Sequence, residues 1–140
     1  MVGAVADWED VRRLALALPD TEEQRSRGQA SWRVHGKLFV LERPLRKRDL
    51  EELGAAAPDG PVLAARTEHL TAKAALLVDD PSVYFTTSHF DGYPMILVVL
   101  TRIGLADLEE LIVEAWLSKA PKRLAAEYIA THGLGGDDGV

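Results

Sequence analysis

Apolar residues recur every three or four positions in three stretches of the chain, a spacing that predicts amphipathic helices. These stretches are residues 8–18, 105–119 and 122–132. Asp7 is the expected N-cap of the first helix, with Glu9 and Asp10 in its first turn, and Pro19 ends it. Their apolar faces, which include Trp116, identify these helices as core elements rather than binding segments.

Short runs rich in Val, Leu and Phe predict β-strands between the first helix and the last two. Two of these runs flank His35-Gly36, a two-residue connection typical of a β-hairpin. The strands are expected at residues 31–34, 37–43, 61–66, 83–86 and 95–100, with a short edge strand within 21–28. Smaller helices are expected at 46–53 and 68–78, the second of which should pack Leu70, Ala74 and Leu77.

Several strands are apolar at successive positions, so both faces of the sheet require cover. The clearest cases are residues 38–41, 62–65 and 95–100. The first helix and the long helix at 105–119 can shield one face. The smaller helices, a second subunit or a ligand must close the other, and a homodimer is the commonest of these solutions.

Length and composition favour one domain. The chain has 140 residues, 47% of them hydrophobic, and no cysteine, which excludes a disordered chain, disulfides and thiolate metal sites. We expect a single domain over residues 1–132 and a glycine-rich tail over 133–140. The longest apolar run, 93–100, is far shorter than the roughly 20 residues of a membrane span. The first ten residues lack Lys and Arg, so we expect no secretory signal and a cytoplasmic protein without a membrane partner.

Charge is distributed very unevenly. The net charge is −6, yet residues 25–48 hold eight Lys and Arg side chains and only one acid, Glu42. Such a block creates a local positive field. The alternative is an ordinary solvated surface neutralised by nearby acids such as Asp49, Glu51 and Glu52.

The predicted hairpin would present many of these cations beside its tip, where a two-stranded ribbon can enter a nucleic-acid groove and contact phosphates. Arg33 and Lys37 are expected to point outward there, and a second contact is expected where the last two helices meet. The candidate nucleic-acid-binding residues are Arg33, His35, Lys37, Arg43, Arg46, Lys47, Arg48, Lys119, Lys122 and Arg123. The acidic remainder of the chain opposes this reading, because dedicated DNA-binding domains are usually basic.

No set of residues indicates catalysis. His89 and Asp91 in the polar loop 86–94 are candidates for a metal ligand or a base, but the loop lacks the further ligands that a site requires. A turn whose polar groups cap neighbouring strands is the favoured interpretation. The chain also lacks a P-loop, a nucleophile elbow and an HExxH motif. We therefore expect no enzyme, no metal and no cofactor.

Four segments resemble the bacterial MmcQ/YjbR-like family: LALPDTEE (16–23), WRVHGKLFV (32–40), FTTSHFDGYP (85–94) and AWLSKAPKRLAAEY (115–128). The resemblance implies an α+β fold with a two-layer antiparallel sheet, an N-terminal helix and C-terminal helices, similar to the frataxin-like and secretion-chaperone-like folds. It also implies a double-wing architecture, a label of DNA binding and no defined catalytic site. Residues 87–93 replace a Lys/His/Trp-rich segment of better-known members, and 46–60 resembles a local insertion.

Two functions follow as expectations. The first is weak, non-catalytic DNA binding by phosphate contacts of the basic hairpin. The alternative is a protein-interaction module, chaperone-like or dimeric, without a nucleic-acid role.

Overall fold

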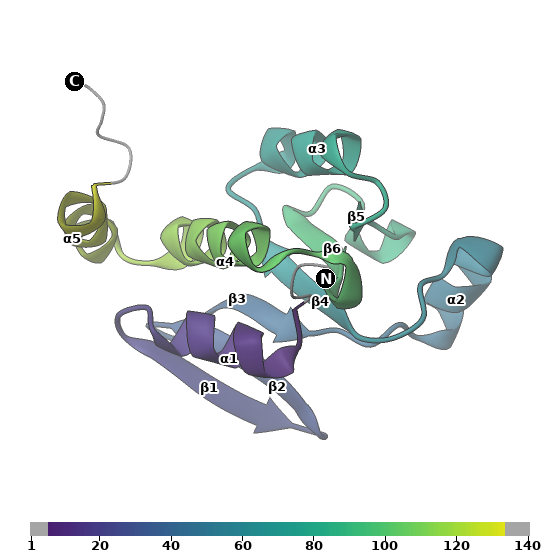
Figure 1. The fold of residues 1–140 in the computed structure, drawn as a ribbon, viewed down its shortest axis with the longest axis horizontal. Coiled ribbons are helices and arrows are strands. Elements are labelled where there is room, and N and C mark those ends of the chain that lie inside the picture. Colours follow the sequence, from purple (N-terminus) through teal and green to yellow (C-terminus); the bar gives the residue numbers. More distant parts are fainter. Residues whose placement is uncertain (1–5, 134–140) are drawn as a thin grey trace, which may run out of the picture.

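The structure is a computed structural model that describes residues 6–133. A six-stranded antiparallel sheet runs in the order β1-β2-β3-β4-β6-β5, with helices packed on it (Figure 1). In chain order the helices and strands are α1 (Trp8–Leu16), β1 (Thr21–Ser26), β2 (Gln29–Val34), β3 (Lys37–Glu42), α2 (Lys47–Leu53), β4 (Val62–Arg66), α3 (Leu70–Asp79), β5 (Tyr84–Phe85), β6 (Met95–Val99), α4 (Leu105–Lys119) and α5 (Lys122–His132). Single 3₁₀ turns are η1 (Gly54–Ala56), η2 (Ser88–Phe90) and η3 (Leu100–Arg102). The α+β class is confirmed, whereas most of the predicted tail lies outside the described residues.

The first helix begins as its sequence predicts. The Asp10 amide donates to the Asp7 carboxylate at 3.0 Å, and the Asp7 amide donates to the Asp10 carboxylate at 3.0 Å. This reciprocal capping box satisfies two amides that the first turn of a helix leaves without partners.

The hairpin and its edge strand are also confirmed. Val34 of β2 pairs with Lys37 of β3 across a turn in which His35 has a φ of 50° and Gly36 a φ of 77°. Positive φ at both positions matches the twist of the strands, and glycine adopts it without steric cost. β1 continues the meander as a full edge strand, in which Thr21 pairs with Val34.

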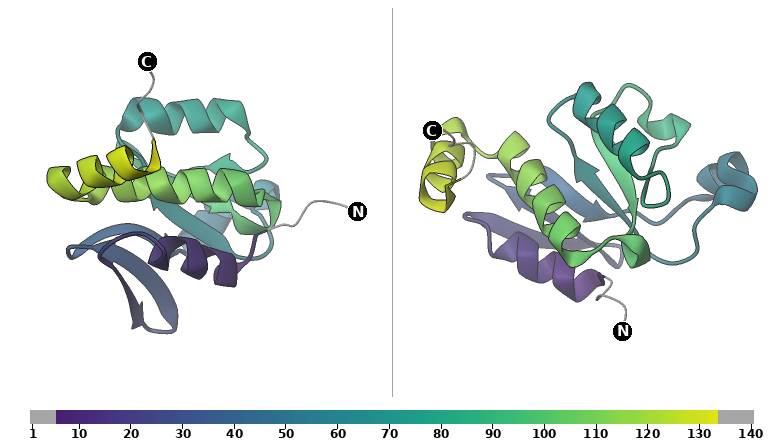
Figure 2. Two further views of the ribbon diagram at one scale, coloured as in Figure 1. Left: turned by 60° about the vertical axis from the view of Figure 1, so that its left-hand side comes forward. Right: turned by 45° about the horizontal axis from the view of Figure 1, so that its top comes forward.

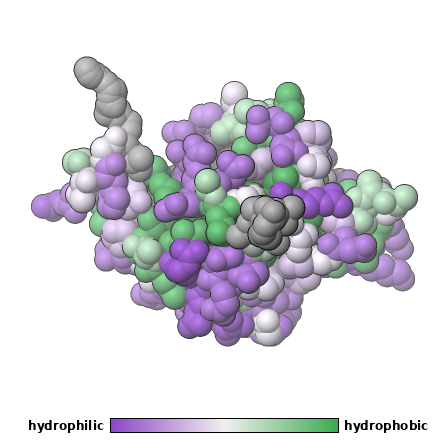
Figure 3. All heavy atoms as spheres, viewed as in Figure 1, coloured by the Kyte–Doolittle hydropathy of each residue, from purple (hydrophilic) through white to green (hydrophobic). Residues whose placement is uncertain are grey.

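Helices α1 and α4 lie side by side on one face of the sheet (Figure 2). Trp32 and Trp116 are fully buried between these layers. Each indole N–H is satisfied: that of Trp116 donates to the Pro19 carbonyl at 3.1 Å and that of Trp32 donates to Glu23 at 3.1 Å. Both tryptophans are therefore core residues. On the outside of this layer, hydrophilic side chains cover most of α1 and β1, and hydrophobic ones gather where α4 meets α1 (Figure 3).

The chain itself covers part of the other face. A second, smaller cluster buries Val62, Ala64, Met95 and Leu97 beneath Phe90, with Leu41, Leu45 and Phe85 packed against it. Phe90 is supplied by the η2 turn, so this loop acts as a lid over the second face. A homodimer, one of the solutions expected for this face, remains a prediction.

Helix α3 packs differently from the prediction. Leu70 is 49% exposed and Ala74 is exposed, whereas Lys73 is only 6% exposed, and Leu76 and Leu77 contact the core. The buried Lys73 ammonium donates to the carbonyls of Phe90 at 2.7 Å and Tyr93 at 2.9 Å. The prediction is confirmed for Leu77 and wrong for Leu70 and Ala74, because these two carbonyls make the burial of a lysine favourable on this helix.

Two further observations complete the fold. Gly133 ends α5 in a left-handed conformation, as expected for a helix C-terminus. Within residues 6–133, none of the helices is long and apolar enough to cross a membrane.

Candidate nucleic-acid interface

Three cations from separate elements meet near the tip of the β2–β3 hairpin. Helix α4 packs across β3 and β4 and brings Lys119, its last residue, towards Lys37 at the start of β3 and Arg66 at the end of β4. Burial lowers the pKa of Lys119, and the positive charges of Arg66 and Lys37 lower it further. We call Lys37, Arg66 and Lys119 the tip cluster.

The tip cluster is not neutralised by acids. Among residues 6–133, no carboxylate oxygen lies within 4.0 Å of a charged nitrogen of Lys37, Arg66 or Lys119. The Arg66 guanidinium lies over the Tyr93 ring, 4.8 Å from its centroid, and its buried Nε has no hydrogen-bond partner in this part of the chain. The sequence alone did not identify Arg66 as a candidate site residue, although a charged residue at the end of an apolar strand indicates a side chain at the edge of the core.

Three other predicted residues surround the cluster. Arg33 is half-buried, and its Nη1 donates to the Gly36 carbonyl at 3.4 Å, which holds the guanidinium at the hairpin turn. Lys122 and Arg123 are exposed in the first turn of α5, three and four residues after Lys119. Arg123 makes a loose ion pair with Glu127 at 3.8 Å. Lys122 and Arg123 therefore follow the tip cluster directly along the chain.

His35 is engaged elsewhere. Its Nε2 lies 2.8 Å from Asp20 Oδ2, and both side chains are about half-exposed. The contact fixes the hairpin turn to the end of the α1 segment, so His35 is less available to a phosphate than the prediction assumed.

The prediction that Arg43 faces solvent with the hairpin is wrong. Its side chain is 8% exposed, and its guanidinium pairs with Asp49 at 3.2 Å and lies 5.3 Å from the centroid of the Phe90 ring. Its Nη1 also donates to the Pro44 carbonyl at 2.6 Å. Arg43 is buried because the η2 lid and α2 close over the second face of the sheet at this point.

The other predicted cations are on a separate surface. Arg46, Lys47 and Arg48 are exposed at the start of α2, which lies at the opposite end of the molecule from α5 (Figure 1). The basic block at residues 25–48 is therefore divided between the hairpin and α2 and does not form one surface. The alternative, neutralisation by nearby acids, holds for Asp49, which pairs with Arg43. It does not hold for Glu52, which accepts hydrogen bonds from the Ser88 amide at 3.0 Å and the Ser88 hydroxyl at 2.8 Å.

The loop 86–94 is held by neighbouring elements. Glu52 of α2 caps its 3₁₀ turn at Ser88, and Lys73 of α3 binds the carbonyls that follow. His89 is exposed and packs edge-on against Phe90. Over residues 6–133, the structure brings together no group of three His, Asp or Glu side chains that could hold a metal ion.

Comparisons with known proteins give the family. An uncharacterized protein of Mycobacterium tuberculosis and one of Mycobacterium bovis are each 48% identical over 132 residues, covering 92% of this chain and all of the relative. The crystal structure of a Deinococcus radiodurans protein with a DUF419 domain has the same fold, with a TM-score of 0.60 and 16% identity over 81% of this chain and 78% of that chain. The YjbR family model matches residues 16–118, so this chain belongs to the YjbR family.

Proposed function

We propose that this protein binds nucleic acid weakly and without base selectivity, through phosphate contacts of the tip cluster, and that it is not an enzyme. The observation that carries the proposal is that Lys37, Arg66 and Lys119 lie at the ends of elements that pack together and have no carboxylate partner among the described residues. Three like charges held together are unfavourable by themselves, and an anion relieves their repulsion.

Phosphate binding fits the geometry of this surface. Lys37 starts the strand after a two-residue turn, so it projects at the end of a narrow ribbon. Arg33, Lys122 and Arg123 lie around it and supply further donors. Because these groups are flexible cations rather than a fixed row of base-reading side chains, the interaction is expected to be electrostatic and independent of sequence.

The net charge of −6 limits the affinity. Acidic surface elsewhere repels the flanks of a long duplex, so binding is expected at low salt and to weaken steeply as salt rises. A nucleic-acid role agrees with the DNA-binding label that the resemblance to the MmcQ/YjbR-like family implies.

Salt titration of a labelled DNA duplex tests the proposal. The double variant K37A/K119A removes two phosphate contacts, so the slope of log K against log salt should become shallower by about 1.8, because each contact contributes about 0.9. The matched control is K47A/R48A on α2, which changes the net charge equally at the other end of the molecule and should leave the slope unchanged.

Two results would contradict the proposal. Equal weakening by both double variants would assign the effect to net charge rather than to the tip cluster. Absence of binding at about 20 mM salt, where phosphate contacts are strongest, would remove the nucleic-acid function and favour the protein-interaction module. Melting temperatures of the variants show whether each remains folded.

A further inference from the structure

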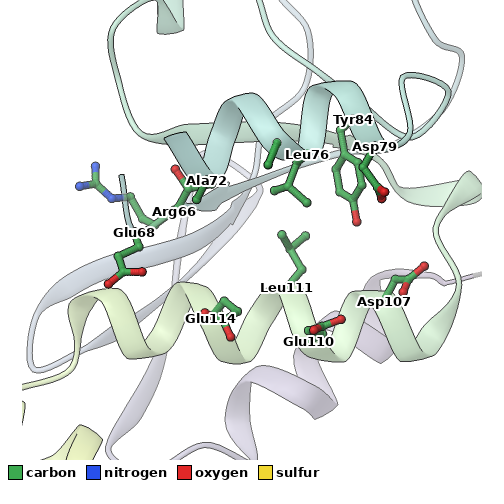
Figure 4. Close-up of a pocket in the computed structure, with 12 residues that line it drawn as sticks. Arg66, Glu68, Ala72, Leu76, Asp79, Tyr84, Asp107, Glu110, Leu111 and Glu114 are labelled. Atoms are coloured by element: carbon green, nitrogen blue, oxygen red, sulfur yellow. The ribbon is translucent and has the colours of Figure 1, made fainter. Parts of the chain in front are cut away.

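A groove lies between α3 and α4. It has a volume of about 440 Å³, and Tyr84 of β5 lies at one end of it (Figure 4). This volume is within the range of small-molecule sites, which is roughly 300–1,000 Å³. The proposed nucleic-acid function shares one residue with this groove, Arg66, and does not use the rest of its lining.

The walls of the groove combine carboxylates with aliphatic side chains. Glu68 and Asp79 lie on the α3 side, and Asp107, Glu110 and Glu114 lie on α4. Between them, Ala72, Leu76 and Leu111 line the interior. Arg66, which lies over the Tyr93 ring, is the basic side chain of this lining, against five carboxylates. The groove is therefore strongly negative at its rim and apolar within.

Tyr84 provides a second, independent observation. The residue is only 7% exposed, and its hydroxyl points into the space between the two helices (Figure 4). Among residues 6–133 this hydroxyl takes part in no hydrogen bond, and its oxygen is open to the groove rather than fully buried, so a ligand in the groove can reach it. Burial, followed by the charges of Asp107, Asp79, Asp80 and Glu110, raises its pKa to about 12. The hydroxyl is thus neutral at pH 7 and can accept a hydrogen bond from a cation.

The carboxylates that line the groove repel one another. Burial and the charges of Glu110 and Glu68 raise the pKa of Glu114. A ligand that carries positive charge along the rim relieves this repulsion. Among residues 6–133 the acids form no group that could hold a metal ion, so they suit a ligand with separated charges better than a single ion.

We propose that the groove between α3 and α4 binds a linear aliphatic polyamine. Its ammonium groups pair with Asp107, Glu110 and Glu114, and one of them donates a hydrogen bond to the Tyr84 hydroxyl. Its methylene chain packs against Leu76 and Leu111. The aliphatic lining argues for this class, because a hydrated inorganic cation gains nothing from apolar walls.

Calorimetric titration of the whole chain with spermidine, in the absence of nucleic acid, tests the site. Saturable binding with one molecule per chain is expected. The double variant E110Q/E114Q should weaken it about tenfold, since it removes two partly exposed ion pairs. The control E51Q/D59N changes the charge equally at exposed positions outside the groove and should leave the affinity within about twofold.

Tyr84→Phe is the sharper variant because it removes only the hydroxyl. It should weaken spermidine binding about fivefold, while the melting temperature stays the same or rises, because no intramolecular hydrogen bond is lost. Unchanged affinity in Y84F would overturn the proposal, as would equal losses in the two double variants. Displacement of spermidine by an equal concentration of Mg²⁺ would also overturn it, because it would reveal a general counterion effect.

Discussion

Arg43 and Asp49 form an ion pair of 3.2 Å between β3 and α2, with side chains that are 8% and 6% exposed. Asp49 also accepts a hydrogen bond from the Arg46 amide at 2.9 Å, at the start of α2. The Asp49 carboxylate therefore neutralises the buried Arg43 guanidinium and also satisfies the backbone amide at the start of its own helix, α2. This pair removes Arg43 from the basic surface and fixes α2 to the sheet.

Breaking this pair should destabilise the protein strongly. Asp49→Ala leaves the Arg43 charge buried without a partner, a change that typically costs about 3–5 kcal/mol. Urea denaturation measures the loss, and Asp59→Ala at an exposed position of the next loop is the control, with an expected change within about 0.5 kcal/mol. A loss in D49A no larger than that in D59A would show that the guanidinium finds other partners.

The same pair predicts a dependence on pH. Burial acts to raise the pKa of Asp49, but the Arg46 amide and the Arg43 charge outweigh it and lower the pKa below its ordinary value of 3.8. The folded chain therefore binds this proton more weakly than the unfolded chain. The stabilisation is complete above the pKa of Asp49 in the unfolded chain and is lost as pH falls through its pKa in the folded chain. The difference in unfolding free energy between wild type and D49A should therefore narrow only in that acidic range.

Lys73→Met should loosen the loop 86–94. The variant keeps the apolar stem but removes the ammonium donor, while the carbonyls of Phe90 and Tyr93 keep the amides of Tyr93 and Met95, so a cost of about 1 kcal/mol is expected. Hydrogen exchange should show faster exchange at residues 88–95, and little change in α1. Lys47→Met, at an exposed position of α2, is the control. Unaltered exchange in the loop of K73M would show that Glu52 and Phe90 alone hold it.

Local patterns predicted the elements well, because their causes lie close together in the sequence. The Asp7 capping box spans four residues, and the His35-Gly36 turn needs only its own two positive φ angles. Helix α3 shows the limit. Its spacing assigned Leu70 to the core, whereas the partners that bury Lys73 are carbonyls 17 and 20 residues further along the chain.

The candidate site was predicted only in part for the same reason. The charge run identified Lys37, and the helix junction identified Lys119, but only the packing of α4 across the sheet brings them together with Arg66. The run also included Arg43, whose burial depends on Phe90 in a distant loop. The acidic groove was not predicted at all. Its carboxylates lie on two helices that are separate in the sequence, and on each helix they are typical of an ordinary solvent-exposed face.

Trp116 anchors α4 to the chain after α1, and two substitutions separate its packing from its hydrogen bond. Trp116→Ala should cost about 3–5 kcal/mol because the indole is fully buried. Trp116→Phe retains an aromatic ring and leaves the Pro19 carbonyl without the donor at 3.1 Å, so a smaller loss is expected. Thermal denaturation measures both, and equal losses in the two variants would assign the whole effect to the hydrogen bond.

Glu114→Gln should stabilise the protein at neutral pH, in contrast to most substitutions. Burial and the charges of Glu110 and Glu68 raise the pKa of Glu114 above its ordinary value of 4.5, so the folded chain binds this proton more tightly than the unfolded chain. The stability that the protonated group provides is present below the unfolded pKa and is lost as pH rises through the folded pKa. A neutral amide avoids that loss. We expect a gain of up to about 0.5 kcal/mol at pH 7, as for other solvent-accessible positions, which should vanish near pH 4. Calorimetric melting of E114Q at both pH values measures it, with Glu51→Gln on α2 as the control. A gain that is equal at the two pH values would show that charge repulsion in the groove is not its cause.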